Sequence, residues 1–564
     1  MQIFRSQVAA ALAPLLGGEP QRVADALELP PDPQMGDLAL PCFPLARALR
    51  KAPPLIAQDL AGRVQLPPAF ERAEAVGGYL NFFLKPQSLA RDVLQEIGQA
   101  GEEYGNSQQG QGKNIVIDFS SPNIAKPFSF GHLPTTVLGN SIGRLYRALG
   151  YNVIGVNHLG DWGTQFGTLI VAYLKWADND PLTEDGLDKL FKLYVKFHQE
   201  EEAHPELRDE ARAWFRRLEE GDAEATRLWR LFCEVTLQNL RKVYQRLGIH
   251  FDHYTGESFY EDQLEGVIEK AKAAGVTEIS EGALVVPLPG DLPPCILQKS
   301  DGATLYATRD LAAAFYRRET FDPEQIIYVV AMDQSLHFQQ LKLVLKRMGQ
   351  EWADQIVHVS FGLVRLPEGK MSTRKGQVIL LDDVINEATE RIAQIITDKN
   401  PDLPNRDAVA EQVGIGAVIF SALRNSRVKD IIFDWNEVLN FDGETGPYLQ
   451  YTHARCRSVL RRAVAPAQLP ADLAGLTDAP AQRVLKQLSL FPETVEKAAL
   501  AYEPSTMSRY LLDLAQAFNH FYHECRIIGE ASHVEAARLA LVEAVALVLK
   551  KGLGLLGIAA PEQM

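Results

Sequence analysis

Two short apolar runs with a helical stretch between them constrain the fold of this chain more than any other feature of its sequence. The runs lie in GKNIVIDFS (112–120) and NVIGVNHLG (152–160), and the helical pattern covers Pro134 to Leu149. Runs rich in β-branched residues are typical of buried strands. Because strand, helix and strand follow one another, the pattern predicts a parallel β-α-β unit.

The same rhythm returns later in the chain, after an interruption. Long charged helices are predicted from about residue 178, within a segment of about 178–300 that we interpret as an insertion. QIIYVVAM (325–332), a helix from Leu336 to Met348, and IVHVSFGLV (356–364) then supply further strands and a crossover. We therefore expect a Rossmann-like, doubly wound parallel sheet.

At 564 residues the chain is too long for one hydrophobic core, so several domains are expected. Residues 1–88 combine an amphipathic helical start with the extended GGYLNFFL and predict an α+β domain. The sheet with its insertion is expected over 113–385, a helical connector over 386–445, and a C-terminal α-helical bundle over 446–564. The predicted fold class is therefore multidomain α/β.

Charge and cysteine content exclude several classes of protein. The net charge is −15, yet residues 446–564 carry 12 Lys and Arg against 11 Asp and Glu, so this quarter is the part expected to face a polyanion. The 5 cysteines are scattered and lack metal-ligand spacing, which favours a reduced chain without a zinc site. No apolar run approaches the length of a membrane span, so we expect neither a signal peptide nor a membrane helix.

Two segments far apart in the sequence have the composition of phosphate-binding loops. Gly131-His132 lies where a loop enters the helix near Pro134, and unpaired N–H groups, the helix dipole and an imidazole favour phosphate there. EGKMSTRKG (368–376) combines glycines, cations and hydroxyls in the manner of a loop that closes onto a polyphosphate. Taken singly, the two segments are also compatible with a helix cap and a solvated basic turn. Together they predict one ATP site.

A third glycine-containing segment, GLGLLG (552–557), fits the pattern G-x-G-x-x-G. It follows a helical run instead of a strand, and no β-α-β unit comes after it. We interpret it as a helix end and not as a dinucleotide site.

The order of these motifs resembles the class I aminoacyl-tRNA synthetases, and specifically the arginyl-tRNA synthetase family. Ser129 to His132 is similar to the family's HIGH signature, and Lys370-Met371-Ser372 is similar to its KMSK loop. Further matches are SSPNIAKPF (120–128), NHLGDWGTQFG (157–167), LYATRD (305–310), HFQQLK (337–342) and GPYLQYTHAR (446–455). The resemblance covers nearly the whole chain and implies ATP-dependent ligation of L-arginine to its tRNA through an arginyl-adenylate.

The resemblance also implies roles for individual residues. His132, Lys126 and Lys370 would stabilise charge on the phosphates. The ATP-binding residues would be Ser129, Gly131, His132, Lys370, Met371 and Ser372. The amino acid arginine would be bound at its α-amino and carboxylate end by Asp118, Asn123 and Gln340, and at its guanidinium by Tyr306, Asp310 and Glu257. A carboxylate pocket selects a planar guanidinium by bidentate geometry.

Contacts with tRNA are implied at both ends of the chain. Arg455, Arg457 and Arg461 lie near helical spacing in a domain similar to the family's anticodon-binding domain. Their spacing alone favours a solvated helix face. The N-terminal domain, with Gly36-Asp37, is similar to the family's added domain, which contacts the tRNA elbow. We expect a monomeric, cytoplasmic enzyme that uses ATP with Mg²⁺, L-arginine and tRNA(Arg), and has no metal site of its own.

Several positions depart from the family pattern. Ser129 replaces the first histidine of HIGH, Pro134 replaces the usual arginine, Thr373 replaces the second lysine of KMSK, and Asp118 stands where many relatives have glutamate. Lys126 is the candidate for the missing lysine charge. The departures leave open a synthetase-like tRNA-binding protein without catalysis. The shared ATP signatures leave open a different class I synthetase or a nucleotidyltransferase.

Overall fold

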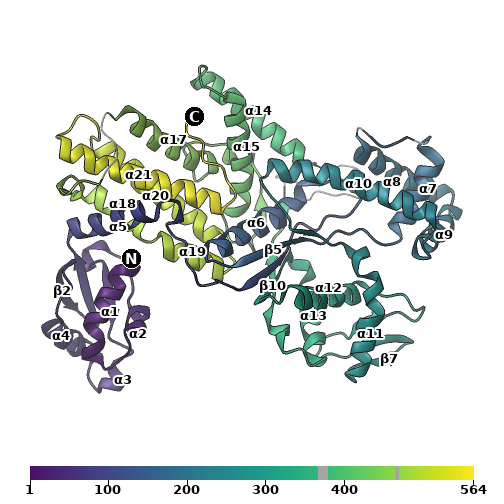
Figure 1. Ribbon diagram of the computed structural model, residues 1–564, viewed down its shortest axis with the longest axis horizontal. Coiled ribbons are helices and arrows are strands. Elements are labelled where there is room, and N and C mark those ends of the chain that lie inside the picture. The colour runs from purple at the N-terminus through teal and green to yellow at the C-terminus, as the bar shows by residue number, and fades with distance from the viewer. Residues whose placement is uncertain (179, 184, 366–378, 464–468) are drawn as a thin grey trace.

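The computed structural model describes residues 1–178, 180–183, 185–365, 379–463 and 469–564. The molecule is elongated, with the N-terminal domain and the C-terminal helices at one end, a sheet near the middle and a lobe of charged helices at the other end (Figure 1). Within the described residues, no helix is long and apolar enough to cross a membrane.

A five-stranded sheet forms the centre of the molecule. Its strand order is β11-β10-β4-β5-β6, and every neighbouring pair is parallel. The strands are β4 (Asn114–Asp118), β5 (Asn152–Asn157), β6 (His253–Tyr254), β10 (Gln325–Ala331) and β11 (Ile356–Phe361). Since β5 lies on one side of β4 and β10 on the other, the strand order reverses between β4 and β10. Ligands bind at such a point, outside the carboxyl ends of the strands. The predicted Rossmann-like, doubly wound sheet is confirmed.

Alternate residues of β4 enter two separate cores, which explains why helices cover both faces of the sheet. Ile117 packs in the core that includes α6 (Leu133–Ala148). Val116 packs in the core formed with α12 (Tyr306–Phe321) and α13 (Ser335–Arg347). Successive side chains of a strand point to opposite faces, so a strand buried on both faces reads as a continuous apolar run.

The predicted insertion of about 178–300 is not one continuous unit. The charged helices α8 (Gly186–Ala203), α9 (Glu206–Glu219) and α10 (Ala223–Arg246) form a separate lobe together with the largely apolar α7 (Gln165–Trp176), which precedes them (Figure 1). The chain then returns to the central sheet, because β6 pairs with β5. After β6 come α11 (Leu264–Ala273) and a small sheet of β7 (Glu278–Ser280), β8 (Ala283–Val286) and β9 (Cys295–Gln298).

The N-terminal domain is α+β, as predicted. Its antiparallel sheet has the order β1-β3-β2 and is accompanied by short helices. The elements are α1 (Gln2–Leu16), α2 (Pro20–Ala26), β1 (Leu38–Pro41), α3 (Ala46–Leu49), α4 (Pro53–Arg63), β2 (Phe70–Val76) and β3 (Tyr79–Leu84), followed by the linking helix α5 (Pro86–Ala100). Asp37 is an anchor here, since it accepts a hydrogen bond from Leu84 N at 2.7 Å and pairs with Lys486 at 2.5 Å.

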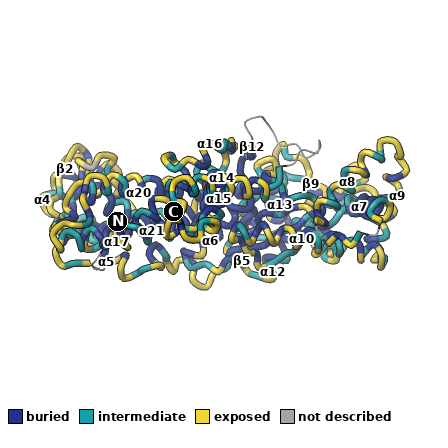
Figure 2. Tube along the Cα trace, turned by 90° about the horizontal axis from the view of Figure 1, so that it is seen from above, coloured by how far each residue is buried: buried dark blue, intermediate teal, exposed yellow. Residues whose placement is uncertain are grey.

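The C-terminal part is helical, as predicted. A small parallel pair connects β12 (Val364–Arg365), which follows β11, with β13 (Ile431–Ile432) in the helical part. The helices are α14 (Leu381–Lys399), α15 (Arg406–Leu423), α16 (Trp435–Val438), α17 (Gly446–Arg462), α18 (Ala479–Ser489), α19 (Phe491–Leu500), α20 (Ser505–Glu524) and α21 (Ser532–Leu555). Gly557, with φ 81°, follows the end of α21, so GLGLLG spans a helix end. Figure 2 shows the buried segments along the middle of the molecule and the exposed ones at its rim.

Candidate active site

The loop between β4 and α6 has an unusual backbone conformation. Ser120, Ser121 and Ala125 have φ angles of 74°, 45° and 58°, in the left-handed region that side chains disfavour. The backbone N–H of Ser120 donates to Thr135 Oγ1 of α6 at 3.0 Å, which holds the start of the loop. Strain of this kind persists only where the surroundings determine the conformation, and it is common at ligand sites.

Helix α10 clamps the same loop from the charged lobe. Thr236 Oγ1 accepts a hydrogen bond from Ala125 N–H at 3.1 Å, and the Tyr244 hydroxyl lies 2.8 Å from Ser120 Oγ. Both α10 side chains are buried. Because Lys126 directly follows Ala125, α10 fixes the backbone that carries the predicted catalytic lysine.

His132 lies at the mouth of α6. Its Nδ1 is 3.0 Å from Ser129 Oγ and 3.2 Å from the Ser129 carbonyl oxygen, and its ring stacks on Phe128 with centroids 5.0 Å apart. Burial lowers the pKa of His132, and the charge of Lys126 acts in the same direction, whereas the Ser129 carbonyl favours the protonated ring, in which Nδ1 carries a proton. The imidazole is therefore neutral at pH 7. Gly131 beside it is exposed.

The predicted ATP residues Lys370, Met371 and Ser372 lie outside the described residues, as does Thr373. The described chain resumes at 379–381, which pairs with the loop before α6. Phe130 N–H donates to the Ile379 carbonyl at 2.9 Å, and Leu381 N–H donates to the Phe128 carbonyl at 3.0 Å. The chain that follows the second predicted segment is therefore adjacent to the first.

Asp118, at the end of β4, is the most buried of the predicted arginine ligands, with 4% of its surface exposed. Its Oδ2 lies 2.7 Å from Nη2 of Arg317 on α12, and Ser121 Oγ donates to its Oδ1 at 2.9 Å. This carboxylate is already paired inside the fold.

Glu257 lies after β6 in a turn that Asp161 holds in place. Asp161 accepts hydrogen bonds from Ser258 N at 2.8 Å and from Ser258 Oγ at 2.6 Å. Gly256 is required by this contact, because a Cβ there would lie 2.4 Å from the Asp161 carboxyl group. Burial raises the pKa of Glu257 to about 7, and the charges of Asp161, Asp310 and Glu261 add to the rise, against that of Arg309.

Asp310 lies on α12 and is bonded to α13. His337 Nε2 is 2.5 Å from its Oδ2. Although burial acts in the opposite direction, the hydrogen bond from His337 and the charges of His158 and Arg317 hold the pKa of Asp310 below its usual range. Burial likewise opposes protonation of His337, but Asp310 raises the pKa of His337 above its usual value. Asp310 is therefore ionised at neutral pH.

The other predicted arginine ligands lie around these carboxylates. Asn123 is exposed and forms a bridge with Gly160, where a Cβ would come within 2.3 Å of Asn123 Oδ1. Tyr306, 68% exposed, begins α12 one turn before Asp310. Gln340 lies one turn after His337 on α13, and its Nε2 donates to the Pro293 carbonyl at 2.9 Å. Glu257 and Asp310 thus lie near enough for their charges to interact, and the other predicted ligands lie on neighbouring elements.

The predicted tRNA residues lie on α17, where the structure separates them. A cavity of about 350 Å³ is lined by residues that include Tyr451, Arg455, Arg461, Arg462 and Tyr522. The Arg455 guanidinium lies 4.9 Å from the ring centroid of Tyr451 and 5.4 Å from that of Tyr522. Aromatic and guanidinium planes are the groups on which unpaired bases stack. Arg457 does not line this cavity.

Three family models match consecutive parts of the chain. Residues 2–84 match the arginyl-tRNA synthetase N-terminal domain, residues 93–435 match the catalytic domain of class I (R) tRNA synthetases, and residues 449–564 match the DALR anticodon-binding domain. The chain belongs to the arginyl-tRNA synthetase family. It is a class I aminoacyl-tRNA synthetase, which confirms the predicted enzyme class.

Individual relatives agree with this membership. The arginine–tRNA ligases of Alkaliphilus metalliredigens and Latilactobacillus sakei are 48% and 49% identical to this synthetase, and each alignment covers 100% of both chains. The solved arginyl-tRNA synthetase of Thermus thermophilus is 27% identical, with a TM-score of 0.84 over 100% of this chain and 99% of that one. The Plasmodium falciparum enzyme shares the fold, with 24% identity and a TM-score of 0.80 over 95% of this chain and 94% of that one.

Four side chains of the synthetase's pocket were not predicted as site residues: His158, Asp161, Arg317 and His337. His158, Asp161 and His337 lie in segments that match the family, so a signal was present without a role attached to it. Arg317 is one of two adjacent arginines in a helix, and the sequence does not distinguish it from Arg318. Burial and the contact with Asp118 distinguish it in the structure.

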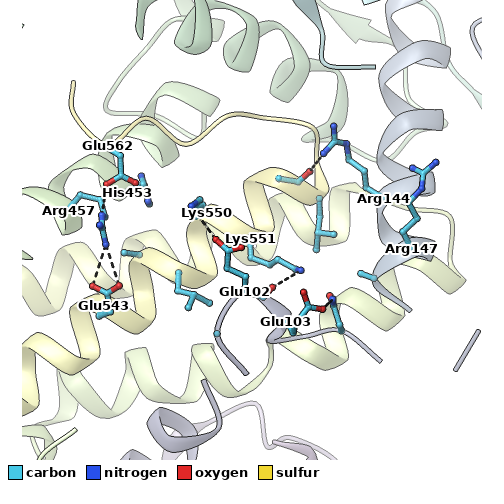
Figure 3. Close-up of a pocket in the computed structure, with 17 residues that line it drawn as sticks. Glu102, Glu103, Arg144, Arg147, His453, Arg457, Glu543, Lys550, Lys551 and Glu562 are labelled. Carbon is cyan, nitrogen blue, oxygen red and sulfur yellow. Dashed lines mark hydrogen bonds and ion pairs between the residues drawn. The ribbon is translucent and has the colours of Figure 1, made fainter. Parts of the chain in front are cut away.

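A larger cavity of about 710 Å³ lies where the synthetase's domains meet, between η2 (Gly101–Glu103), α6, α17 and α21 (Figure 3). Much of its charge is internally paired. Arg457 Nε lies 2.6 Å from Glu562 and its Nη1 lies 3.3 Å from Glu543, while Lys550 lies 3.5 Å from Glu102. These contacts connect η2, which follows the linking helix α5, with α17, α21 and Glu562. We therefore interpret the walls of this cavity as a contact region between domains, which we call the joint. Arg457 belongs to this joint.

Proposed function

We propose that this synthetase attaches L-arginine to tRNA(Arg) in two steps at one site. A carboxylate oxygen of arginine attacks the α-phosphorus of ATP, so that arginyl-adenylate forms and pyrophosphate leaves. The 2′-hydroxyl of the terminal adenosine of tRNA then attacks the adenylate carbonyl, losing its proton as AMP leaves. Family membership supports the reaction class. The group of carboxyl side chains around Glu257 and Asp310, which we call the acidic pocket, supports arginine as the substrate.

The acidic pocket is the observation that carries the choice of arginine. Asp161, Asp310 and Glu261 all raise the pKa of Glu257, so several carboxyl groups share this region. Arg309 acts against them and pairs with Glu261 at 2.8 Å, which leaves Glu257, Asp161 and Asp310 as the carboxyl groups without an arginine partner of their own in the described chain. Gathering like charges away from water costs free energy. A guanidinium placed among them offsets that cost and donates several hydrogen bonds in one plane, whereas a lysine ammonium lacks this planar geometry.

Asp310 and Glu257 are the proposed guanidinium ligands, with Tyr306 beside them. Asp118, Asn123 and Gln340 are the proposed ligands of the α-amino and carboxylate end. This division follows the carboxyl ends of the sheet, since Asp118 ends β4 and Asn123 lies in the loop after it. It places the carboxylate of arginine toward the loop that carries Lys126 and His132.

His132 is the proposed hydrogen-bond donor to the phosphates. If the Ser129 hydroxyl donates to Nδ1, the neutral imidazole carries its proton on Nε2 and donates it to a phosphoryl oxygen. Donors of this kind act as negative charge develops in the transition state. Lys126 and Lys370 supply the positive charge, and Gly131, Met371 and Ser372 complete the proposed ATP contacts.

Mg²⁺ is proposed to accompany the ATP phosphates. In the described ranges, no group of three or more His, Cys, Asp or Glu is arranged to hold a metal ion. The phosphate oxygens of ATP are then the natural ligands, because Mg²⁺ commonly binds through substrate phosphates. We further propose a monomeric enzyme in the cytoplasm, where tRNA and ATP are used for translation.

The cavity on α17 is the proposed anticodon contact. Arg455 and Arg461 line it together with Tyr451 and Tyr522, so it offers both positive charge and stacking surfaces. Arg457 is proposed to act there indirectly, because its ion pair with Glu562 holds the chain end that leads into the same cavity. The N-terminal domain is the proposed contact for the tRNA elbow.

Replacing Asp310 by Asn tests the arginine pocket. The KM for arginine should rise about 10- to 100-fold, because a charge-assisted hydrogen bond is lost, while the KM for ATP should stay within about twofold. Pyrophosphate exchange measured with tRNA present gives both constants. Equal losses for arginine and ATP would place Asp310 outside the arginine pocket.

The same assay, run with each amino acid and with or without tRNA, tests the proposed function itself. Exchange that depends on arginine supports it. Exchange with another amino acid would indicate a different class I synthetase, and no exchange under any condition would indicate a tRNA-binding protein without catalysis.

A further inference from the structure

Arg317 lies in the middle of α12 and is almost completely inaccessible to water, with 1% of its surface exposed. It follows Asp310 by seven residues, which is two helical turns, so both side chains lie on the same face of α12. Its guanidinium reaches Asp118 at the end of β4, and its charge also acts on Asp310. Arg317 therefore stands between the two ends of the proposed arginine pocket.

The surroundings of Arg317 hold it toward Asp118. Nη2 lies 2.7 Å from Asp118 Oδ2, and the guanidinium lies over the Tyr328 ring, 5.1 Å from its centroid. Tyr328 on β10 is opposite Asp118 on β4 in the register of the sheet. The Tyr328 ring and the Asp118 carboxylate therefore lie on neighbouring strands, at the point where the strand order reverses. Ser121 fixes the second oxygen of Asp118. The orientation of the Asp118 carboxylate is thus determined from two sides.

Stability alone does not account for this ion pair. Taking two charges out of water costs more than their attraction returns unless the remaining polar groups are also satisfied. Within the described chain, Nε and Nη1 of Arg317 have no acceptor in regular hydrogen-bond geometry, although the Tyr260 hydroxyl lies nearby, and the buried Tyr328 hydroxyl has no partner. The incomplete bonding indicates a role in the site instead of a gain in folding free energy.

An unpaired Asp118 would compete with Asp310 and Glu257 for the guanidinium of the substrate. Arg317 contacts Asp118 and acts on Asp310, and Asp310 acts on Glu257, so the three carboxyl groups lie in one region of the fold. A guanidinium binds whichever carboxylate is free. Arg317 on Oδ2 and Ser121 on Oδ1 remove this competition, because they leave no pair of free oxygens for the bidentate binding of a second guanidinium. Each Asp118 oxygen keeps a further accepting position, which is compatible with a compact α-ammonium group that donates single hydrogen bonds.

We propose that Arg317 is a positioning residue for arginine: it pairs with Asp118, reserves this carboxylate for the α-ammonium group of the substrate, and directs the substrate guanidinium to Asp310 and Glu257. The proposal rests on the proposed arginine pocket. Under this proposal Arg317 acts through Asp118, so each of the two residues contributes to arginine binding only while the other is present.

The test is a double-substitution cycle of Arg317→Met and Asp118→Asn, with kinetics by pyrophosphate exchange in the presence of tRNA. Each single substitution should raise the KM for arginine by about 10- to 100-fold and leave the KM for ATP within about twofold. The double variant should be no worse than the worse single variant, since the two residues work as one unit. Losses that multiply, or equal changes for arginine and ATP, would overturn the proposal.

Arg318→Met is the matched control. Arg318 is the next residue of α12, but it pairs with Asp322 at 2.8 Å on the outer side of the helix, so its loss should not change the KM for arginine. Arg317→Lys keeps the charge and should recover part of the affinity for arginine. If thermal melting shows that Arg317→Met does not fold, the double variant and Arg317→Lys test the role of Arg317 instead. A folded double variant worse than Asp118→Asn alone, or Arg317→Lys with arginine and ATP equally impaired, would overturn the role.

The outcomes also separate this role from the pocket itself. If Asp118→Asn and Asp310→Asn both leave the use of arginine unchanged, the pocket is misassigned. If these two variants impair it and a folded Arg317→Met does not, the pocket stands and the role of Arg317 is wrong.

Discussion

Single residues in this site take their protonation states from their neighbours. Burial and nearby carboxylates hold the pKa of Glu257 near 7, whereas the hydrogen bond from His337 helps keep Asp310 ionised against its burial. Of these two groups, Asp310 is therefore ionised at neutral pH, whereas Glu257 is divided between its protonated and ionised forms.

We expect the KM for arginine to rise as the pH falls below about 7. The raised pKa of Glu257 means that the protonated form predominates below that pH, and only the carboxylate binds a guanidinium, which is itself always charged. Each further pH unit should cost up to about tenfold in kcat/KM for arginine. Kinetics from about pH 5 to pH 8 measure this, with the KM for ATP as the internal reference.

Glu257→Gln is the control for this pH dependence. Its KM for arginine should be high at every pH, because an amide does not titrate. A wild-type KM for arginine that is constant across the range would show that Glu257 does not bind the substrate.

The proposed role of Ser129 depends on its neighbour His132, whose Nδ1 lies 3.0 Å from the Ser129 hydroxyl. Ser129→Ala should slow adenylate formation by about 10- to 100-fold, because Nδ1 of His132 would then donate to the Ser129 carbonyl and leave Nε2 without a proton for the phosphate. Ser129→Thr keeps the hydroxyl and should retain most of the rate. Single-turnover measurement of adenylate formation compares the two. Equal rates for the Ala variant and the wild type would contradict this tautomer.

At the scale of elements, the insertion contributes to the active site although it lies mainly outside the sheet. Helix α10 reaches back to the loop after β4 through Thr236 and Tyr244, and its Arg246 pairs with Asp382 on α14 and Glu411 on α15. One helix therefore connects the loop that carries Lys126 with the helices that lead to the C-terminal domain.

Thr236→Val tests this clamp. The buried Ala125 N–H would lose its acceptor, which should cost about 1–3 kcal/mol of stability and release the backbone before Lys126. We expect a lower melting temperature together with slower adenylate formation. Thr236→Ser retains the hydroxyl and should behave like the wild type. A Val variant that is destabilised but fully active would limit Thr236 to a role in folding.

At the scale of the whole molecule, the domains are joined by charged contacts. Asp37 pairs with Lys486 between the N-terminal domain and α18, and Arg457 pairs with Glu543 and Glu562 in the joint beside α6 (Figure 3). The cavity around Arg455 lies beyond these joints. These ion pairs connect the N-terminal domain and the C-terminal helices with the rest of the chain.

Replacing Arg455 and Arg461 by Ala should weaken tRNA binding and flatten its dependence on salt. Each lost phosphate contact lowers the slope of log Kd against log salt by about 0.7 for single strands. Filter binding at several salt concentrations measures both effects. Arg391→Ala is the control, because Arg391 is exposed and pairs within its own helix with Glu387. An unchanged slope would show that Arg455 and Arg461 do not contact tRNA phosphates and only form part of a solvated helix face.

Local patterns in the sequence predicted the strands at 112–120 and 152–160, the helices between and after them, and the family's motifs. These features depend on periodicity and on residue order within short segments, which a sequence contains directly. The same patterns marked Asp118, His132 and Asp310 as candidates. The insertion was predicted as one unit because β6 is only two residues long, too short for a periodic signal.

The sequence by itself therefore determined the class of fold, the order of domains and the type of chemistry. The tertiary structure decided which of two adjacent arginines is buried against Asp118, which helix holds the loop of Lys126, and which arginines of α17 line the cavity. Such pairings join residues 118 and 317, or 125 and 236, whose separation along the chain carries no periodic signal. Burial and charge act through space, so only the folded chain reveals which residues they bring together.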